Sequence, residues 1–331
     1  MSKFQYYDVI DSTAIVCNLC QHKCHLKSNQ IGICGVNQNI DNQLSNLVYA
    51  HPVAIHIDPV EKKPLYHMLP NSKVLSFGTV GCNFKCPFCQ NWDISQTNKI
   101  DSSIYVSAQD MLNLVIEHKA QSIAYTYNEP TIFYPYAKDI GLLARERNIR
   151  NIFVSNGYES VEMIEDMAGW LDAINVDLKS WDEGYYKKVL KGGLSQVKDS
   201  LMAIKQNGIW LEVTTLLIDE INSSTRDIES MASFIYNELG SDTPWHLSAF
   251  YPNYKMQDSN PTKIPTLLKA KEIATKVGLK YVYLGNINQA QHTTCAHCQS
   301  VVISREYGNV ANHLQNGQCP KCSRTIEGIW R

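Results

Sequence analysis

Short runs of β-branched and aromatic residues alternate with amphipathic stretches between residues 74 and 285. This alternation is typical of a parallel α/β sheet or barrel. Six strand-helix units and a closing strand predict a partial, open (βα)6 barrel rather than a full eightfold one. The runs predict strands at 74–79, 122–127, 151–155, 173–177, 209–217, 245–250 and 280–284.

Two of the gaps between the predicted strands show a clear helical pattern. One apolar stripe recurs at the spacing of a single helix face and comprises Phe133, Tyr136, Ala137, Ile140 and Ala144. A second stripe follows Ser107, a favourable N-cap residue, and comprises Met111, Leu112, Val115 and Ile116. Helices with such a face can pack on a sheet and connect one parallel strand to the next.

The two flanks lack this alternation and contain most of the cysteines. Residues 1–66 include an extended stretch with Pro and His, and residues 286–331 consist of short segments around four cysteines. The sequence therefore predicts three parts: a cysteine-rich N-terminal segment (1–66), a barrel (67–285) and a C-terminal module (286–331).

Composition narrows the class of protein. Of the 331 residues, 44% are apolar and 19% are charged, which excludes collagen-like, coiled-coil and mostly disordered chains. The 30 basic and 32 acidic residues nearly cancel, so the net charge favours neither nucleic acid nor an anionic membrane as a partner. The sequence shows neither a run of about 20 apolar residues nor a secretory signal, so we expect a cytoplasmic protein.

All 11 cysteines fall into three compact groups. Close-set thiols in a chain without a secretion signal favour metal binding over disulfides. The groups are Cys17, Cys20, Cys24 and Cys34; Cys82, Cys86 and Cys89; and Cys295, Cys298, Cys319 and Cys322.

The middle group directly follows the first predicted strand, at the end of the sheet where α/β barrels place their chemistry. Its spacing is Cys82-x3-Cys86-x2-Cys89. Three thiolates can hold three irons of a [4Fe–4S] cluster and leave the fourth iron without a protein ligand. Structural zinc normally takes four ligands, so zinc is the weaker interpretation of this group.

This motif, with Phe88 before the last cysteine, resembles that of the radical S-adenosylmethionine (SAM) superfamily. The resemblance implies that the open iron binds the amino and carboxylate groups of SAM. An electron from the reduced cluster then cleaves SAM, and the resulting 5′-deoxyadenosyl radical abstracts a hydrogen atom from a substrate. A low-potential electron donor is implied as well.

Further residues match superfamily positions at successive strand ends. Thr126, Tyr127, Asn128 and Glu129 occupy the place of a Gly-Gly-Glu-type segment that contacts the methionyl amino group. Asn156 follows the third predicted strand, and Asp177 with Lys179 resembles the Asp-x-Lys of glycyl-radical-enzyme activases. His246, which opens the sixth strand, is a candidate proton donor or adenine contact; the alternative is a capped surface histidine.

Most of the chain is similar to the AmmeMemoRadiSam radical enzymes, relatives of pyruvate formate-lyase-activating enzyme. The resemblance implies an activase-like oxidoreductase that acts on a protein residue or a small molecule, and cooperation with Memo and Ammecr-type proteins. The similar segments are 17–20, 32–36, 125–131, 246–252 and 283–286.

The two groups of four cysteines predict separate metal sites. Cys295-x2-Cys298 and Cys319-x2-Cys322, separated by twenty residues, are typical of a zinc ribbon, with iron in the same sulfur cage as the alternative. The Cys17, Cys20, Cys24 and Cys34 spacing fits either zinc or an auxiliary iron–sulfur cluster. His22 and His25 could replace a cysteine there.

Two other functions compete with the radical enzyme. A nucleic-acid or protein interaction module would use the zinc ribbon, but residues 295–331 are not strongly basic. A multi-cluster electron carrier would share the cysteines without consuming SAM. Turnover of SAM separates both alternatives from the enzyme.

Overall fold

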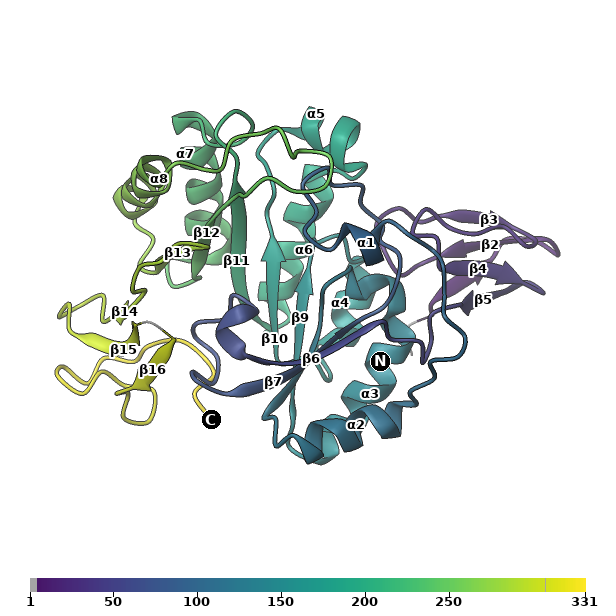
Figure 1. Ribbon diagram of the computed structural model, residues 1–331, viewed down its shortest axis with the longest axis horizontal. Helices are drawn as coiled ribbons and strands as arrows, with labels where there is room; N and C mark the ends of the chain where they lie inside the picture. Colours follow the sequence, from purple (N-terminus) through teal and green to yellow (C-terminus); the bar gives the residue numbers. More distant parts are fainter. Residues whose placement is uncertain (1–4, 307) are drawn as a thin grey trace.

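The computed structural model describes residues 5–306 and 308–331. A sheet of eight strands lies at its centre (Figure 1). The spatial order follows the chain from β6 to β13. Neighbouring strands from β7 to β13 are parallel, and β6 runs antiparallel to β7. The strands are β6 Ala54–Pro59, β7 Lys73–Gly78, β8 Ser122–Tyr125, β9 Arg150–Ser155, β10 Ala173–Asp177, β11 Trp210–Leu217, β12 Trp245–Ala249 and β13 Val282–Gly285. The predicted α/β class and its seven parallel strands are confirmed.

Helices connect the parallel strands, as βα units require. The connecting helices are α1 Trp92–Ser95, α2 Ala108–Glu117, α3 Tyr134–Glu146, α4 Val161–Met167, α5 Glu183–Tyr185, α6 Leu194–Gln206, α7 Thr225–Phe234 and α8 Ile264–Val277. Shorter turns of helix are η1 Val60–Lys62, η2 Pro130–Phe133, η3 Tyr186–Leu190 and η4 Ile235–Leu239.

The apolar stripes behave largely as their spacing predicts. Helix α3 buries all four of its stripe residues, and Phe133 is buried in the preceding turn. Ser107 caps α2: its side chain accepts a hydrogen bond from the Asp110 backbone amide, and the Asp110 side chain accepts one from the Ser107 backbone amide. Ile116 was predicted to be buried and is 49% exposed, because it lies at the edge of the α2 stripe.

Strand β6 extends the sheet beyond the predicted strands. The sequence groups residues 54–59 with the N-terminal segment, but they pair with β7 from Ala54 opposite Gly78 to Pro59 opposite Lys73. Polar His56 and a terminal Pro59 weaken the strand signal, and both are tolerated because β6 lies at an edge. Among the described residues no ladder joins β6 to β13, so the sheet keeps two edges.

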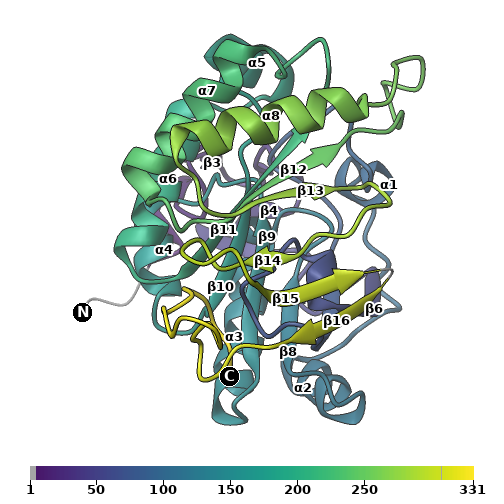
Figure 2. The ribbon, with the colours of Figure 1, turned by 90° about the vertical axis from the view of Figure 1, so that its left-hand side faces the viewer.

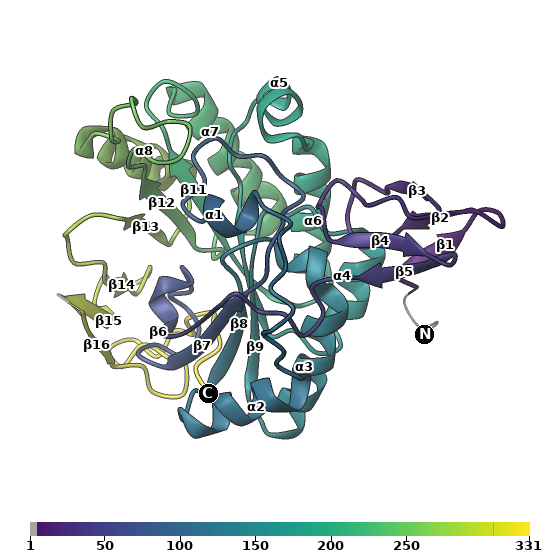
Figure 3. The same cartoon turned by 45° about the vertical axis from the view of Figure 1, so that its right-hand side comes forward.

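The N-terminal residues form two small antiparallel units beside the sheet (Figure 3). They contain β1 Tyr7–Val9, β2 Ala14–Cys17 and β3 His25–Lys27 in one sheet, and β4 Asn37–Ile40 with β5 Gln43–Asn46 in a hairpin. The hairpin turn uses Asp41 and Asn42, both with positive φ, as a tight two-residue turn requires. A bridge between Cys20 and Glu159 ties this segment to the region before α4.

The C-terminal residues form β14 Thr293–Thr294, β15 Val301–Glu306 and β16 Asn309–Asn312, which lie near β13 (Figure 2). Their small core contains Cys295, Cys319 and Val302, packed against Tyr281 and Tyr283 at β13. Within the described part of the chain, no helix has the length and apolar character needed to cross a membrane.

Candidate active site and cysteine centres

The loop after β7 carries Cys82, Cys86 and Cys89 and lies at the carboxyl end of the parallel strands. Asn128 fixes the start of this loop: its Oδ1 accepts from the Thr79 amide at 3.1 Å, and its Nδ2 donates to the Gly81 carbonyl at 3.0 Å. Cys82 and Cys86 are buried, and Cys89 is half-buried. The structure therefore presents the three thiols at the predicted end of the sheet.

Cys82 and Cys86 lie in an environment that disfavours free thiolates. Burial raises the pKa of Cys82, and the nearby Glu129 carboxylate raises it further. Burial also raises the pKa of Cys86 to about 11, although Lys179 partly opposes this shift. A bound metal supplies the positive charge that a buried thiolate needs, so the loop suits metal ligation better than acid–base chemistry.

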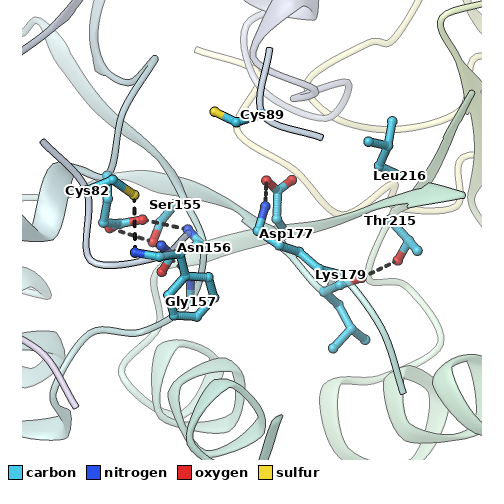
Figure 4. A network of polar contacts seen from close by, with 12 residues as sticks. Cys82, Cys89, Ser155, Asn156, Gly157, Asp177, Lys179, Thr215 and Leu216 are labelled. Atoms are coloured by element: carbon cyan, nitrogen blue, oxygen red, sulfur yellow. Dashed lines mark hydrogen bonds and ion pairs between the residues drawn. The ribbon is translucent and has the colours of Figure 1, made fainter. Parts of the chain in front are cut away.

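Polar residues at the next strand ends face the cysteine loop (Figure 4). Asn156, after β9, donates from Nδ2 to Asn83 Oδ1 at 2.8 Å, and its backbone amide donates to Glu129 Oε2 at 2.7 Å. Asn156 Oδ1 is buried and has no hydrogen-bond partner among the described residues. The structure thus brings Asn156 and Glu129 together beside the loop and leaves one buried acceptor for a ligand.

Asp177 and Lys179 form an ion pair at the end of β10, with Lys179 Nζ at 2.6 Å from Asp177 Oδ2. Lys179 Nζ also lies 6.0 Å from the centre of the Phe88 ring, within the cysteine loop. Burial alone would lower the pKa of Lys179, but Asp177 and the Cys86 thiol raise it above its ordinary value. The ammonium group therefore stays charged beside the loop, where a carboxylate ligand would find a partner.

The segment after β8 has a backbone conformation that usually favours glycine. Tyr127 has a φ of 68°, at the place where the resembling family has a Gly-Gly-Glu-type segment. Its hydroxyl donates to Asp58 Oδ2 at 3.1 Å, and Lys63 Nζ lies 4.8 Å from its ring centre. These two contacts join the Tyr127 side chain to the region of β6 and η1.

Glu159 is a buried acidic residue that sequence reasoning missed. Ser155 Oγ contacts Glu159 Oε1 and also lies 3.0 Å from Glu129 Oε1, so one hydroxyl links two buried carboxyl groups. Burial raises the pKa of Glu159 to about 8, and Glu129 adds to this effect. An isolated Glu in the sequence gives no signal of burial. The closeness of Glu159 to Glu129 is therefore visible only in the structure.

His246 lies apart from the other predicted site residues. It is the second residue of β12, and its Nε2 lies 2.6 Å from Glu212 Oε2 inside the sheet. Glu212 also accepts from the backbone amides of Tyr66 and His67, at 2.9 and 2.7 Å. The structure therefore places His246 in a buried polar network near the amino ends of the strands, rather than beside the cysteine loop.

The N-terminal quartet of Cys17, Cys20, Cys24 and Cys34 lines one cavity, together with residues of the segment after β8. Asn37 Nδ2 donates toward Cys34 Sγ at 3.5 Å. His22 lines the same cavity, and its Nε2 lies 3.0 Å from the Asn83 carbonyl oxygen. The cavity therefore brings together four candidate thiol ligands and one candidate imidazole ligand.

The C-terminal quartet is more compact. The sulfurs of Cys295 and Cys322 lie 3.6 Å apart, and those of Cys298 and Cys319 are also 3.6 Å apart. All four sulfurs lie within 4.8 Å of one another. A tetrahedral ion with metal–sulfur bonds of about 2.3 Å requires sulfur separations of roughly 3.8 Å, so this quartet has the dimensions of a single-ion site.

Comparisons with known proteins agree with this site. The model of the radical SAM superfamily matches residues 77–235, the region from β7 to η4 that carries the cysteine loop and the polar strand ends. A protein of Methanocaldococcus jannaschii described as uncharacterised is 35% identical over 99% of both chains. The region that carries the cysteine loop is therefore similar to the radical SAM superfamily, and this similarity implies SAM and a [4Fe–4S] cluster as cofactors.

Two further comparisons concern relatives and fold. A putative glycyl-radical enzyme activating enzyme of M. jannaschii is 26% identical, over 63% of this chain and 78% of its own length. The crystal structure of SuiB from Streptococcus suis superposes with a TM-score of 0.52 at 12% identity, covering 69% of this chain and 52% of SuiB. The chain is thus similar to a protein described as a putative activating enzyme, and the SuiB match shows a shared fold.

Proposed function

We propose that the protein is an activase-like radical SAM enzyme of the AmmeMemoRadiSam type. A [4Fe–4S] cluster, when bound, supplies the electron that cleaves SAM and so generates a radical able to abstract hydrogen from the substrate. What supports the proposal is the position of Cys82, Cys86 and Cys89 next to the charged Asp177–Lys179 pair. Cooperation with Memo and Ammecr-type proteins belongs to the same proposal.

The residues around the loop suit the binding of a zwitterionic nucleoside. Cys82, Cys86 and Cys89 would hold the cluster. Lys179 offers a fixed positive charge to a carboxylate, and Asn156 Oδ1 offers an unpaired acceptor among the described residues. Thr126, Tyr127 and Asn128 would offer backbone carbonyls to an ammonium group, and buried Glu129 holds Asn156 in place.

Aromatic side chains beside the cysteine loop offer a contact surface for the substrate. Trp92, which follows the loop, is 44% exposed and stacks on Tyr254 with ring centres 5.2 Å apart. The Lys255 amide donates to the Pro87 carbonyl at 3.0 Å and joins the segment after β12 to the cysteine loop. We propose that this surface receives the part of a protein or small molecule that loses hydrogen.

Reductive cleavage of SAM tests the proposed activity directly. Anaerobically reconstituted protein is incubated with dithionite and SAM, and 5′-deoxyadenosine is measured. We expect the wild-type protein to form 5′-deoxyadenosine and Cys86→Ala to form none, because the variant lacks one cluster ligand. Glu272→Gln, an exposed change on α8, serves as the control and is expected to match the wild type.

Two outcomes would contradict the proposal. A wild-type protein that contains reduced clusters but forms no 5′-deoxyadenosine would favour the electron-carrier alternative. Equal product from the wild type and Cys86→Ala would show that the SAM cleavage does not depend on the cysteine loop.

A further inference from the structure

The three cysteine groups differ in how far apart their sulfurs lie. Among the residues that the structure describes, only the C-terminal quartet brings three or more sulfurs within 4.8 Å of one another. The three thiols of the loop after β7 are more widely spaced, as expected when each thiolate binds a different iron of a cluster. The N-terminal quartet is not such a compact group either, so in its spacing it resembles the loop after β7 rather than the C-terminal quartet.

The quartet nevertheless converges on one enclosed space. Cys17, Cys20, Cys24 and Cys34 line the same cavity, which Ile132 and Thr131 close from the segment after β8. Gly32 borders it: a Cβ at this position would lie 3.7 Å from Cys24 Sγ and 3.8 Å from Cys34 Sγ. The four thiols therefore converge on one small space beside Gly32.

A hydrogen-bond donor accompanies the quartet, as is common around cluster sulfurs. Asn37 is buried, and its Nδ2 lies 3.5 Å from Cys34 Sγ and 2.8 Å from the Ile132 carbonyl oxygen. Hydrogen bonds to the sulfurs help to set the reduction potential of an iron–sulfur cluster. The contact from Asn37 thus gives the site a feature that tunes a redox centre.

The quartet also lies directly against the cysteine loop after β7. Gly81, the residue before Cys82, packs so closely on the quartet that a Cβ there would lie 2.7 Å from the Cys34 carbonyl oxygen. His22, two residues after Cys20, contacts the Asn83 carbonyl at 3.0 Å. Backbone neighbours of both cysteine groups are therefore in contact.

We propose that Cys17, Cys20, Cys24 and Cys34 hold a second [4Fe–4S] cluster, adjacent to the cluster site of Cys82, Cys86 and Cys89. Each thiolate would bind one iron, so no iron of this cluster is left open for SAM. The proposal goes beyond the proposed function, because it concerns the metal at a second group of cysteines that the proposed SAM cleavage does not use.

The test uses the full chain with the substitutions Cys82→Ala, Cys86→Ala and Cys89→Ala. This triple variant is reconstituted anaerobically with ferrous iron and sulfide, and its iron, zinc and acid-labile sulfide are measured with Mössbauer spectra. We expect about four irons and four sulfides per chain, because one four-iron cluster remains. A sulfide-free protein, or a spectrum of a two-iron cluster, would overturn the proposal.

Matched variants assign the remaining cluster to its ligands. Adding Cys17→Ser and Cys20→Ser to the triple variant is expected to remove the sulfide, whereas adding Cys319→Ser is expected to leave it unchanged. One conclusion does not require that the variant with Cys17→Ser and Cys20→Ser folds. If sulfide is retained when Cys319→Ser is added, the C-terminal quartet does not hold the remaining cluster. The triple variant lacks the SAM-binding cluster, so the result is independent of the proposed SAM cleavage.

Magnetic resonance tests the adjacency of the two clusters. In the reduced wild-type protein, two neighbouring paramagnetic clusters are expected to broaden or split each other's EPR signals. The triple variant should show the unperturbed signal of the quartet cluster alone. Wild-type spectra that equal a simple sum of two isolated signals would contradict adjacency.

Discussion

At the residue scale, the contact between Ser155 and two carboxyl groups constrains the protonation of the site. Ser155 has one hydroxyl hydrogen, and Glu129 Oε1 and Glu159 Oε1 both lie against its oxygen. If the hydroxyl donates to Glu129, Glu159 must carry a proton in order to donate in return. The buried Glu159 therefore fits a protonated acid, in agreement with its pKa of about 8.

Glu159→Gln is expected to make stability less dependent on pH. The pKa of Glu159 is about 8 in the folded state and about 4.5 when unfolded. The stabilisation that its protonated carboxyl group contributes is therefore fully present below about pH 4.5 and is lost as the pH rises through about 8. One proton changes stability by at most about 1.4 kcal/mol per pH unit, and an amide cannot titrate. We expect the variant to be at least as stable as the wild type at pH 9. Between pH 6 and 9 its free energy of unfolding should fall by less than that of the wild type.

Anaerobic denaturant unfolding at pH 6 and pH 9 measures this difference. Glu272→Gln is the control, because Glu272 is exposed and its pKa is lowered, so it does not titrate in this range. Identical pH slopes for Glu159→Gln and the wild type would show that Glu159 is ionised throughout.

At the scale of elements, local sequence patterns predicted most of the sheet and part of the site. Buried β-rich runs and the Ser107 cap are local signals, and the cysteine spacing marks the loop after β7. Strand β6 was missed because its partner lies 14 or more residues away and its His and Pro resemble a loop. Glu159 and Glu212 were missed because burial depends on contacts between distant segments, which no local pattern encodes.

The end of β7 depends on a close approach between two backbones. A Cβ on Gly78 would lie 2.5 Å from the Thr126 carbonyl oxygen and 3.1 Å from Tyr127 Cβ. Gly78→Ala is therefore expected to force β7 and β8 apart at their carboxyl ends and to destabilise the protein by about 2 kcal/mol. The same shift should weaken retention of the loop cluster.

Denaturant unfolding and iron content after gel filtration measure these two effects. Gly169→Ala is the matched control, because the added Cβ would meet only the Asp166 carbonyl at an ordinary 3.5 Å. We expect the free energy of unfolding of this control to lie within about 0.5 kcal/mol of the wild-type value. A Gly78→Ala protein of unchanged stability and iron content would mean that the strand ends can separate without cost.

At the scale of the whole molecule, the two ends of the sheet have different partners. The carboxyl ends carry the cysteine loop, and the N-terminal quartet lies beside it. Near the amino ends, His67 joins the C-terminal module to the sheet: its ring nitrogens contact the Glu327 carbonyl at 2.8 Å and the Tyr283 hydroxyl at 2.7 Å. The C-terminal module therefore supports the sheet at a distance from the proposed chemistry.

The C-terminal quartet is expected to hold one structural zinc, and Cys319→Ser should release it. This module has a small core of its own, so metal binding contributes directly to its folding free energy. We expect a loss of about 3 kcal/mol or more in local stability.

Hydrogen exchange measures this loss. Exchange should become faster in residues 293–331 and near Tyr66 and His67, because Arg305 and Glu327 connect these segments by hydrogen bonds. Exchange in β7 to β10 and the iron content should stay at wild-type values. Faster exchange throughout the sheet would instead show that the module is needed for the fold as a whole.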